Sequence, residues 1–246
     1  MSLFRARVAG DIVVDFLPSE QDSSDVLIIC DGLPSGSSKD ALVKWFSRQG
    51  FWTFHLRYRG TWESGENFLD HSPEQDLLDL IKALSDGVSD IWSHQTFQVT
   101  PKRVGIVGAS FGGTAALMAS RSTLVHRVIA LSPVVDWTAE SDEPMDVLED
   151  IVRRGYMGAY RFSHEDWLKL SRGDFFQPMA CVKTFDPHKI FVAHAQDDRV
   201  VPIDPIRTFV EHVGCPHRFY KTGGHHLWQK VMHWPMRARL VSFLRS

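Results

Sequence analysis

Short apolar runs alternate along the chain with stretches of helical periodicity, and this alternation restricts the fold more than any other feature. The run at about 25–30 is apolar on both faces, as is typical of a central strand in a parallel sheet. The segment at about 39–49 has helical periodicity and ends at Gly50, which is a natural helix stop. Repeated strand–turn–helix units predict an α/β fold with a mostly parallel sheet covered by helices on both faces.

The same patterns of apolar residues predict the positions of the other elements. Two alternating runs on either side of Gly10 predict an N-terminal antiparallel hairpin over about 3–9 and 11–18. The remaining strands are expected at 51–58, 103–107, 128–135, 190–194 and 217–221, and the remaining helices at 73–86, 112–121 and 228–244.

Residues 138–188 interrupt the alternation. They contain two helical patterns, at about 144–155 and 164–171, between one buried strand and the next. About 50 residues are too few for an independent hydrophobic core. We therefore expect one α/β domain over 1–246, with 138–188 inserted as a small helical cap over the site.

Composition and motifs narrow the functional classes. The 246 residues carry a formal net charge of −3 without a Lys/Arg-rich run, so we expect no nucleic-acid partner. The twelve histidines and three cysteines form none of the usual zinc-ligand spacings, and G-x-G-x-x-G is absent at the glycine-rich turn. We therefore expect neither a metal nor another cofactor.

Localisation is predicted from three absences. The first residues lack the apolar stretch of a signal peptide, and no apolar run approaches the roughly 20 residues that span a bilayer. Three scattered cysteines do not form a disulfide framework. We expect a cytoplasmic protein without a membrane partner, and the sequence leaves the oligomeric state open.

The sequence Gly108-Ala109-Ser110-Phe111-Gly112-Gly113 matches the G-x-S-x-G nucleophile elbow between an expected strand and an expected helix. In such an elbow the serine occupies a sharp, strained turn that exposes its hydroxyl. The strand and helix backbones then come so close that side chains two positions before or after the serine would clash. Gly108 and Gly112 would provide that clearance, which predicts Ser110 as a nucleophile.

A serine hydroxyl needs a general base and an orienting carboxylate, and in folds with this elbow the chain order is serine, acid, histidine. Asp198 lies in the turn after the strand at 190–194 and is the expected acid, with Asp197 as its close alternative. Asp136, after the strand at 128–135, is a further candidate.

The expected base is His225, which directly follows two glycines after the last strand. A turn of small residues there allows the imidazole to reach back toward the serine. His226 is the alternative.

With these residues, the chain resembles the α/β-hydrolase superfamily over nearly its whole length, and most closely the bacterial esterases and the hydrolase domain of the prolyl oligopeptidase group. The resemblance implies a Ser110–Asp198–His225 triad. It also implies an oxyanion hole made by the backbone N–H groups of Leu33 and Phe111.

One position departs from the superfamily pattern. A strand ending in His-Gly normally precedes the first oxyanion donor, whereas this chain has Asp31 before Gly32. A carboxylate near an oxyanion opposes it unless it points away or pairs with a cation, for which Arg57 or Arg59 is the candidate. The stretch 57–66 resembles a loop that shapes the rim of the site in these proteins.

The leading functional hypothesis is a serine hydrolase that cleaves a carboxylic ester or related small acyl compound through an acyl-enzyme. A small-peptide peptidase and an acyltransferase use the same triad and stay open. A ligand-binding protein without catalysis is the alternative from another class, since fold alone does not fix function. A dehalogenase would need a carboxylate at the position of Ser110.

Overall fold

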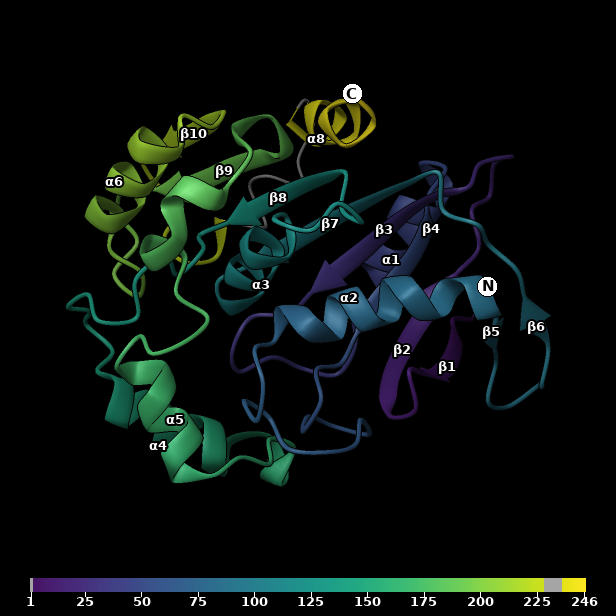
Figure 1. Ribbon diagram of the computed structural model, residues 1–246, viewed down its shortest axis with the longest axis horizontal. Helices are drawn as coiled ribbons and strands as arrows, with labels where there is room; N and C mark the ends of the chain where they lie inside the picture. Colours follow the sequence, from purple (N-terminus) through teal and green to yellow (C-terminus); the bar gives the residue numbers. More distant parts are fainter. Residues whose placement is uncertain (1, 228–235) are drawn as a thin grey trace.

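In the computed structural model, which describes residues 2–227 and 236–246, eight strands form one twisted sheet (Figure 1). In chain order they are β1 (Phe4–Val8), β2 (Ile12–Leu17), β3 (Asp25–Cys30), β4 (Trp52–Leu56), β7 (Arg103–Ala109), β8 (Arg127–Leu131), β9 (Ile190–Ala195) and β10 (His217–Tyr220). Their order across the sheet is β1-β2-β4-β3-β7-β8-β9-β10. The strands from β4 to β10 in that order run parallel, and β2 pairs antiparallel with β1 and β4. The predicted fold class and N-terminal hairpin are confirmed.

Helices cover both faces of this sheet. The α-helices are α1 (Asp40–Arg48), α2 (Glu74–Ala83), α3 (Phe111–Ala119), α4 (Met145–Arg154), α5 (His164–Ser171), α6 (Ile203–Val213) and α8 (Met236–Arg245). Short 3₁₀ turns occupy η1 (Leu84–Asp86), η2 (Gly155–Gly158), η3 (Pro178–Thr184) and η4 (Pro187–Lys189), and β5 (Val88–Ser89) pairs with β6 (Thr96–Phe97) as a separate small hairpin.

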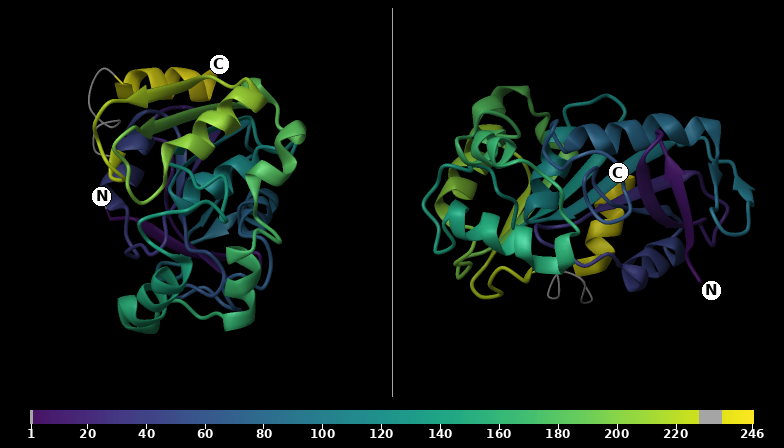
Figure 2. Two further views of the ribbon diagram at one scale, coloured as in Figure 1. Left: turned by 90° about the vertical axis from the view of Figure 1, so that its left-hand side faces the viewer. Right: turned by 90° about the horizontal axis from the view of Figure 1, so that it is seen from below.

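Two buried apolar clusters correspond to the two faces. Side chains of α1 and α8 pack on one face of the central strands, and side chains of α2, α3 and α6 pack on the other. In the right-hand view of Figure 2, α2 lies on one side of the sheet while α1 and α8 lie on the other. Alternate residues of β3 point to opposite clusters, so Ile28 belongs to the α3 side and Leu27 to the α1 side. The strand is apolar throughout because both faces are buried.

The two helices expected within 138–188 are present as α4 and α5. In Figure 1 they lie together, away from the sheet and beyond the end to which the arrow of β3 points. The segment after η2 is tied to the loop at 60–68, where Trp62 N–H donates to Ala159 O at 2.8 Å and Arg161 N–H donates to Gly60 O at 2.8 Å. The stretch 57–66 therefore contacts the segment that joins α4 to α5.

The structure differs from the expected elements at one boundary and in one additional helix. The strand expected over 128–135 ends at Leu131, because Ser132 adopts a positive φ of 45° and Pro133 has no N–H for a ladder. Helix α6 was not predicted from the sequence, because Pro202 and Pro205 are typical of a loop. Proline is nevertheless tolerated in the first turn of a helix, where N–H groups have no intrahelical acceptor. Of the helix expected over 228–244, residues 228–235 lie outside the described part.

Helix α6 should contribute strongly to stability through Phe209, which is fully buried with its ring centroid 5.4 Å from that of Phe185. Phe209→Ala is expected to lower the free energy of unfolding by about 3–5 kcal/mol, because it leaves a cavity as well as losing apolar burial. Urea denaturation measures this change. Arg207→Ala, on the exposed side of the same helix, is the control and should cost less than about 1 kcal/mol. Equal losses in the two variants would contradict this packing.

Candidate active site

Ser110 lies in the sharp turn between β7 and α3. Its backbone has φ 54° and ψ −123°, a region that is strained for a residue with a side chain, and its N–H donates to Leu131 O at 2.8 Å. That bond ties the turn to the neighbouring strand β8. The geometry is the nucleophile elbow that the sequence predicts.

The glycines of the motif relieve backbone crowding. A Cβ on Gly108 would lie 2.0 Å from Gly112 O, and a Cβ on Gly112 would lie 2.5 Å from Cys30 O and 2.6 Å from Asp31 O. These neighbours are backbone atoms, so they have little freedom to move aside. Gly112 thus lets α3 begin directly against the end of β3, which places the turn after β3 beside Ser110.

Asp198 and His225 meet at the same end of the sheet. The Nδ1 of His225 lies 3.0 Å from Asp198 Oδ2, and Asp198 Oδ1 accepts the N–H groups of Val200 and Val201 at 3.0 Å each. Because the carboxylate only accepts, Nδ1 carries the proton and Nε2 is left as the basic nitrogen. Burial alone would raise the pKa of Asp198, but hydrogen bonds from His225 and the Val201 N–H outweigh burial and lower it, so the carboxylate stays ionised.

The alternative residues are engaged elsewhere. Asp197 accepts a hydrogen bond from Gly224 N–H at 2.8 Å, whereas Asp136 accepts from the Thr138 N–H at 2.9 Å and from Gln177. His226 is exposed beside His225, with 6.3 Å between the ring centroids. The geometry therefore favours Asp198 and His225 over these candidates.

Ser110 and His225 line one cavity of about 520 Å³. The turn after β3 forms another wall, and a Cβ on Gly32 would come within 3.4 Å of the Ser110 Cβ. Within the described residues no hydrogen bond joins the Ser110 hydroxyl to the His225 ring. Such contacts are often long before substrate binds.

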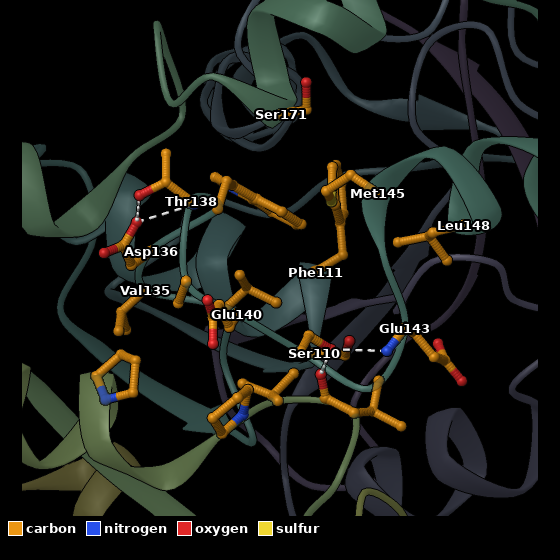
Figure 3. Close-up of a pocket in the computed structure, with 18 of the residues that line it drawn as sticks. Ser110, Phe111, Val135, Asp136, Thr138, Glu140, Glu143, Met145, Leu148 and Ser171 are labelled. Atoms are coloured by element: carbon orange, nitrogen blue, oxygen red, sulfur yellow. Dashed lines mark hydrogen bonds between the residues drawn. The ribbon is translucent and has the colours of Figure 1, made fainter.

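A second cavity of about 560 Å³ adjoins the first, and Ser110, Leu33 and Leu148 line both. Figure 3 shows Phe111, Met145 and Leu148 on one side of this cavity, with Asp136 bonded to Thr138 on the opposite side. Its other apolar walls come from the segment after β8 and from the start of α6. The inserted segment and α6 thus shape the space next to the serine.

His194 is fully buried beside the acid. Its Nε2 lies 3.0 Å from Val201 O, so this nitrogen donates, and 3.8 Å from Asp198 Oδ2. Burial lowers the pKa of His194 despite the nearby carboxylate. A neutral His194 leaves the charge of Asp198 for His225.

The predicted pairing of Asp31 with an arginine is wrong. Asp31 pairs with neither Arg57 nor Arg59; its Oδ2 lies 2.7 Å from His55 Nε2, and its Oδ1 lies 3.0 Å from Lys39 Nζ. Burial would raise the pKa of Asp31, but His55 and Lys39 together hold it below its usual value.

The two arginines serve the framework instead. Arg57 bonds Asp15 at 2.7 Å, and Arg59 bonds Asp76 at 2.7 Å and Asp11 at 2.9 Å. Both side chains are buried, and Arg59 holds its loop in place through these ion pairs.

Sequence reasoning missed Lys39 and His55 at this position. The signal for His55 is the strand register: Ile29 of β3 pairs with His55 of β4, so residue 31, on the same face, comes diagonally next to it. Arg57 lies two residues further on, beside Asp15 of the antiparallel neighbour, since Asp15 pairs with His55. No spacing rule marks Lys39, which precedes α1.

The close approach at the elbow predicts a stability effect. Gly112→Ala should lower the free energy of unfolding by about 2–4 kcal/mol, because its methyl group would overlap two backbone carbonyl oxygens. Gly155→Ala is the matched control, because its φ of −67° suits alanine and no atom lies within 4 Å of the added Cβ. Chemical denaturation compares the two, and a Gly112→Ala variant as stable as Gly155→Ala would contradict the crowding.

Solved structures with a similar fold include a peptidase, an esterase and an α/β hydrolase. An acylaminoacyl peptidase from Pyrococcus horikoshii matches with a TM-score of 0.66 at 19% identity, over 98% of this chain and 39% of that one. An esterase from Pyrococcus furiosus matches with a TM-score of 0.70 at 15% identity, over 99% and 90% of the two chains. The α/β hydrolase GrgF from a Penicillium species matches with a TM-score of 0.72 at 18% identity, over 99% and 97%. The chain therefore spans well under half the length of the peptidase.

Sequence comparison gives the family. No curated protein matches the chain. The prolyl oligopeptidase family model, however, matches residues 37–231, which include the elbow serine, Asp198 and His225. The chain belongs to the prolyl oligopeptidase family and has the α/β-hydrolase fold.

Proposed function

We propose that the protein is a serine hydrolase that cleaves a carboxylic ester or a related small acyl compound. The observation that carries this proposal is the 3.0 Å hydrogen bond from His225 to the buried Asp198, beside a cavity that Ser110 also lines. A strained serine, an oriented imidazole and a buried carboxylate at one end of a sheet are the parts of an acyl-transfer site.

In the first step, Ser110 Oγ attacks the carbonyl carbon of the substrate while His225 Nε2 takes its proton. Asp198 holds the imidazole by its Nδ1–H and stabilises the positive charge that forms on the ring. The carbonyl oxygen becomes an oxyanion, for which Phe111 N–H, at the start of α3, is one donor. Leu33 N–H, in the turn after β3, is the second.

Collapse of the intermediate breaks the bond to the leaving group, which takes the proton from His225. A water then attacks the acyl-enzyme, giving its proton to His225, and the second tetrahedral intermediate releases the acid and the Ser110 hydroxyl. No cofactor takes part in either half of this cycle.

The cavities support a small acyl substrate. The larger is lined by buried apolar side chains of Phe111, Trp137 and Ile206 together with Met145 and Leu148. A volume of about 560 Å³ suits a ligand of modest size.

None of the helices that the structure describes is long and apolar enough to cross a bilayer.

Peptide hydrolysis is the second candidate, and the family match favours it. The chemistry of acylation is the same for an ester and an amide, but the amide is the more demanding substrate because its nitrogen must be protonated as it leaves. Comparing a p-nitrophenyl ester with the p-nitroanilide of the same acyl group separates the two candidates.

The role of Ser110 is tested by Ser110→Ala. This variant should keep the fold of the parent protein and lose about 10⁴- to 10⁶-fold in kcat on a panel of p-nitrophenyl esters. Circular dichroism and thermal unfolding check the fold, and steady-state kinetics measure the loss. Turnover retained in Ser110→Ala would show that another group is the nucleophile.

The two neighbouring aspartates give a matched comparison. Asp198→Ala should reduce kcat by about 10⁴-fold, because His225 loses its orienting carboxylate. Asp197→Ala removes an acceptor for Gly224 N–H and should reduce kcat by less than about tenfold. The same ester assay measures both variants. A larger loss in Asp197→Ala would reverse the assignment of the acid.

A further inference from the structure

The turn that carries the first oxyanion donor contains a buried carboxylate. Asp31 is only 8% exposed and lines the same cavity as Ser110. Its carbonyl oxygen would lie 2.6 Å from a Cβ on Gly112 at the beginning of α3. An uncompensated negative charge here would oppose a second negative charge forming on the substrate oxygen.

Each oxygen of this carboxylate has its own partner. His55 on β4 is fully buried and lies 2.7 Å from one carboxylate oxygen, whereas Lys39, just before α1, lies 3.0 Å from the other. Lys39 Nζ also donates to Ser35 Oγ at 2.8 Å. The lysine thus joins both ends of the loop at 31–39.

The rest of that loop is fixed by two more contacts. Ser35 N–H donates to the Tyr160 hydroxyl at 2.8 Å, and Arg57 donates to Ser37 O at 2.7 Å. The loop is therefore held at its start by β4, at its middle by the inserted segment and at its end by Lys39. Leu33, between these points, has little freedom to change the direction of its N–H.

We propose that the Asp31–Lys39 ion pair, anchored by His55, is a positioning element of the oxyanion hole. It fixes the loop that carries Leu33, and Lys39 neutralises a carboxylate that would otherwise repel the oxyanion. This role rests on the proposed function. Lys39 acts through Asp31 and Leu33 and takes no proton from the substrate.

Because the proposed role depends on the charge of Lys39, it predicts a specific change in kcat and KM. Lys39→Met leaves the Asp31 carboxylate without its cation, so kcat on a p-nitrophenyl ester should fall on the order of tenfold, while KM stays within about twofold. Lys39→Arg keeps the cation and should retain most of the parent kcat. Lys44→Met, which removes a partly exposed lysine of α1 paired with Asp40, is the matched control and should behave as the parent.

The double variant separates charge balance from simple damage. Adding Asp31→Asn to Lys39→Met removes the unbalanced carboxylate, so kcat should rise above that of Lys39→Met alone. A merely structural role predicts that the second substitution lowers kcat further. A substrate-anchoring role for Lys39 predicts a higher KM with unchanged kcat. Either of these results would overturn the proposal.

Inhibition by butylboronic acid gives a readout that does not depend on turnover. Boron bonds to Ser110 Oγ, the hydroxyl proton passes to His225, and the four-coordinate boron carries a negative charge like that of the tetrahedral intermediate. Ki should rise in Lys39→Met by about the factor by which kcat falls. An active parent protein with the same Ki in Lys39→Met and Lys44→Met would contradict the positioning role alone. A parent protein that neither turns over the ester nor binds the boronic acid would contradict the proposed function and this role with it.

Discussion

The contact of the α3 backbone with the end of β3 sets the arrangement of the whole site. Gly112 meets the carbonyl groups of Cys30 and Asp31 at distances that leave no space for a side chain, and Gly108 meets Gly112 in the same way. This crowding explains why Ser110 is held at a positive φ, since the chain must turn from strand to helix within one residue. It also brings the turn that carries Leu33 against the serine. The proposed nucleophile and the two proposed oxyanion donors therefore depend on one tight packing of backbones.

Two buried carboxylates beside this packing have different proposed roles, one in catalysis and one in positioning a loop. Asp198 is bonded by two backbone N–H groups and by His225, and in the proposed mechanism its negative charge orients the base. Asp31 is paired with Lys39 and His55, and in the proposed role this pairing fixes the loop that carries Leu33. A buried charge needs partners in either case, and the partners decide whether it takes part in chemistry or in positioning.

Much of this architecture could be predicted from the sequence because it depends on local patterns. Apolar runs marked the central strands, and the glycines around Ser110 marked the elbow. The order serine, aspartate, histidine then selected Asp198 and His225, which the structure brings into contact.

Where the prediction failed, the controlling interaction was not local. The partners of Asp31 follow from the register of β3 on β4, and the prolines that disguised α6 are acceptable only at its first turn. The walls of the cavities depend on how the segment 138–188 packs against the strand ends, which periodicity does not determine.

In the proposed mechanism, His225 and Asp198 activate Ser110. Reaction with a fluorophosphonate probe, followed by mass spectrometry of the labelled peptides, tests this activation, because the probe reacts with activated serines and needs no knowledge of the substrate. We expect one adduct, on Ser110, that is absent in Ser110→Ala and strongly reduced in His225→Ala. A folded parent protein that remains unlabelled, or an adduct on another residue, would contradict it.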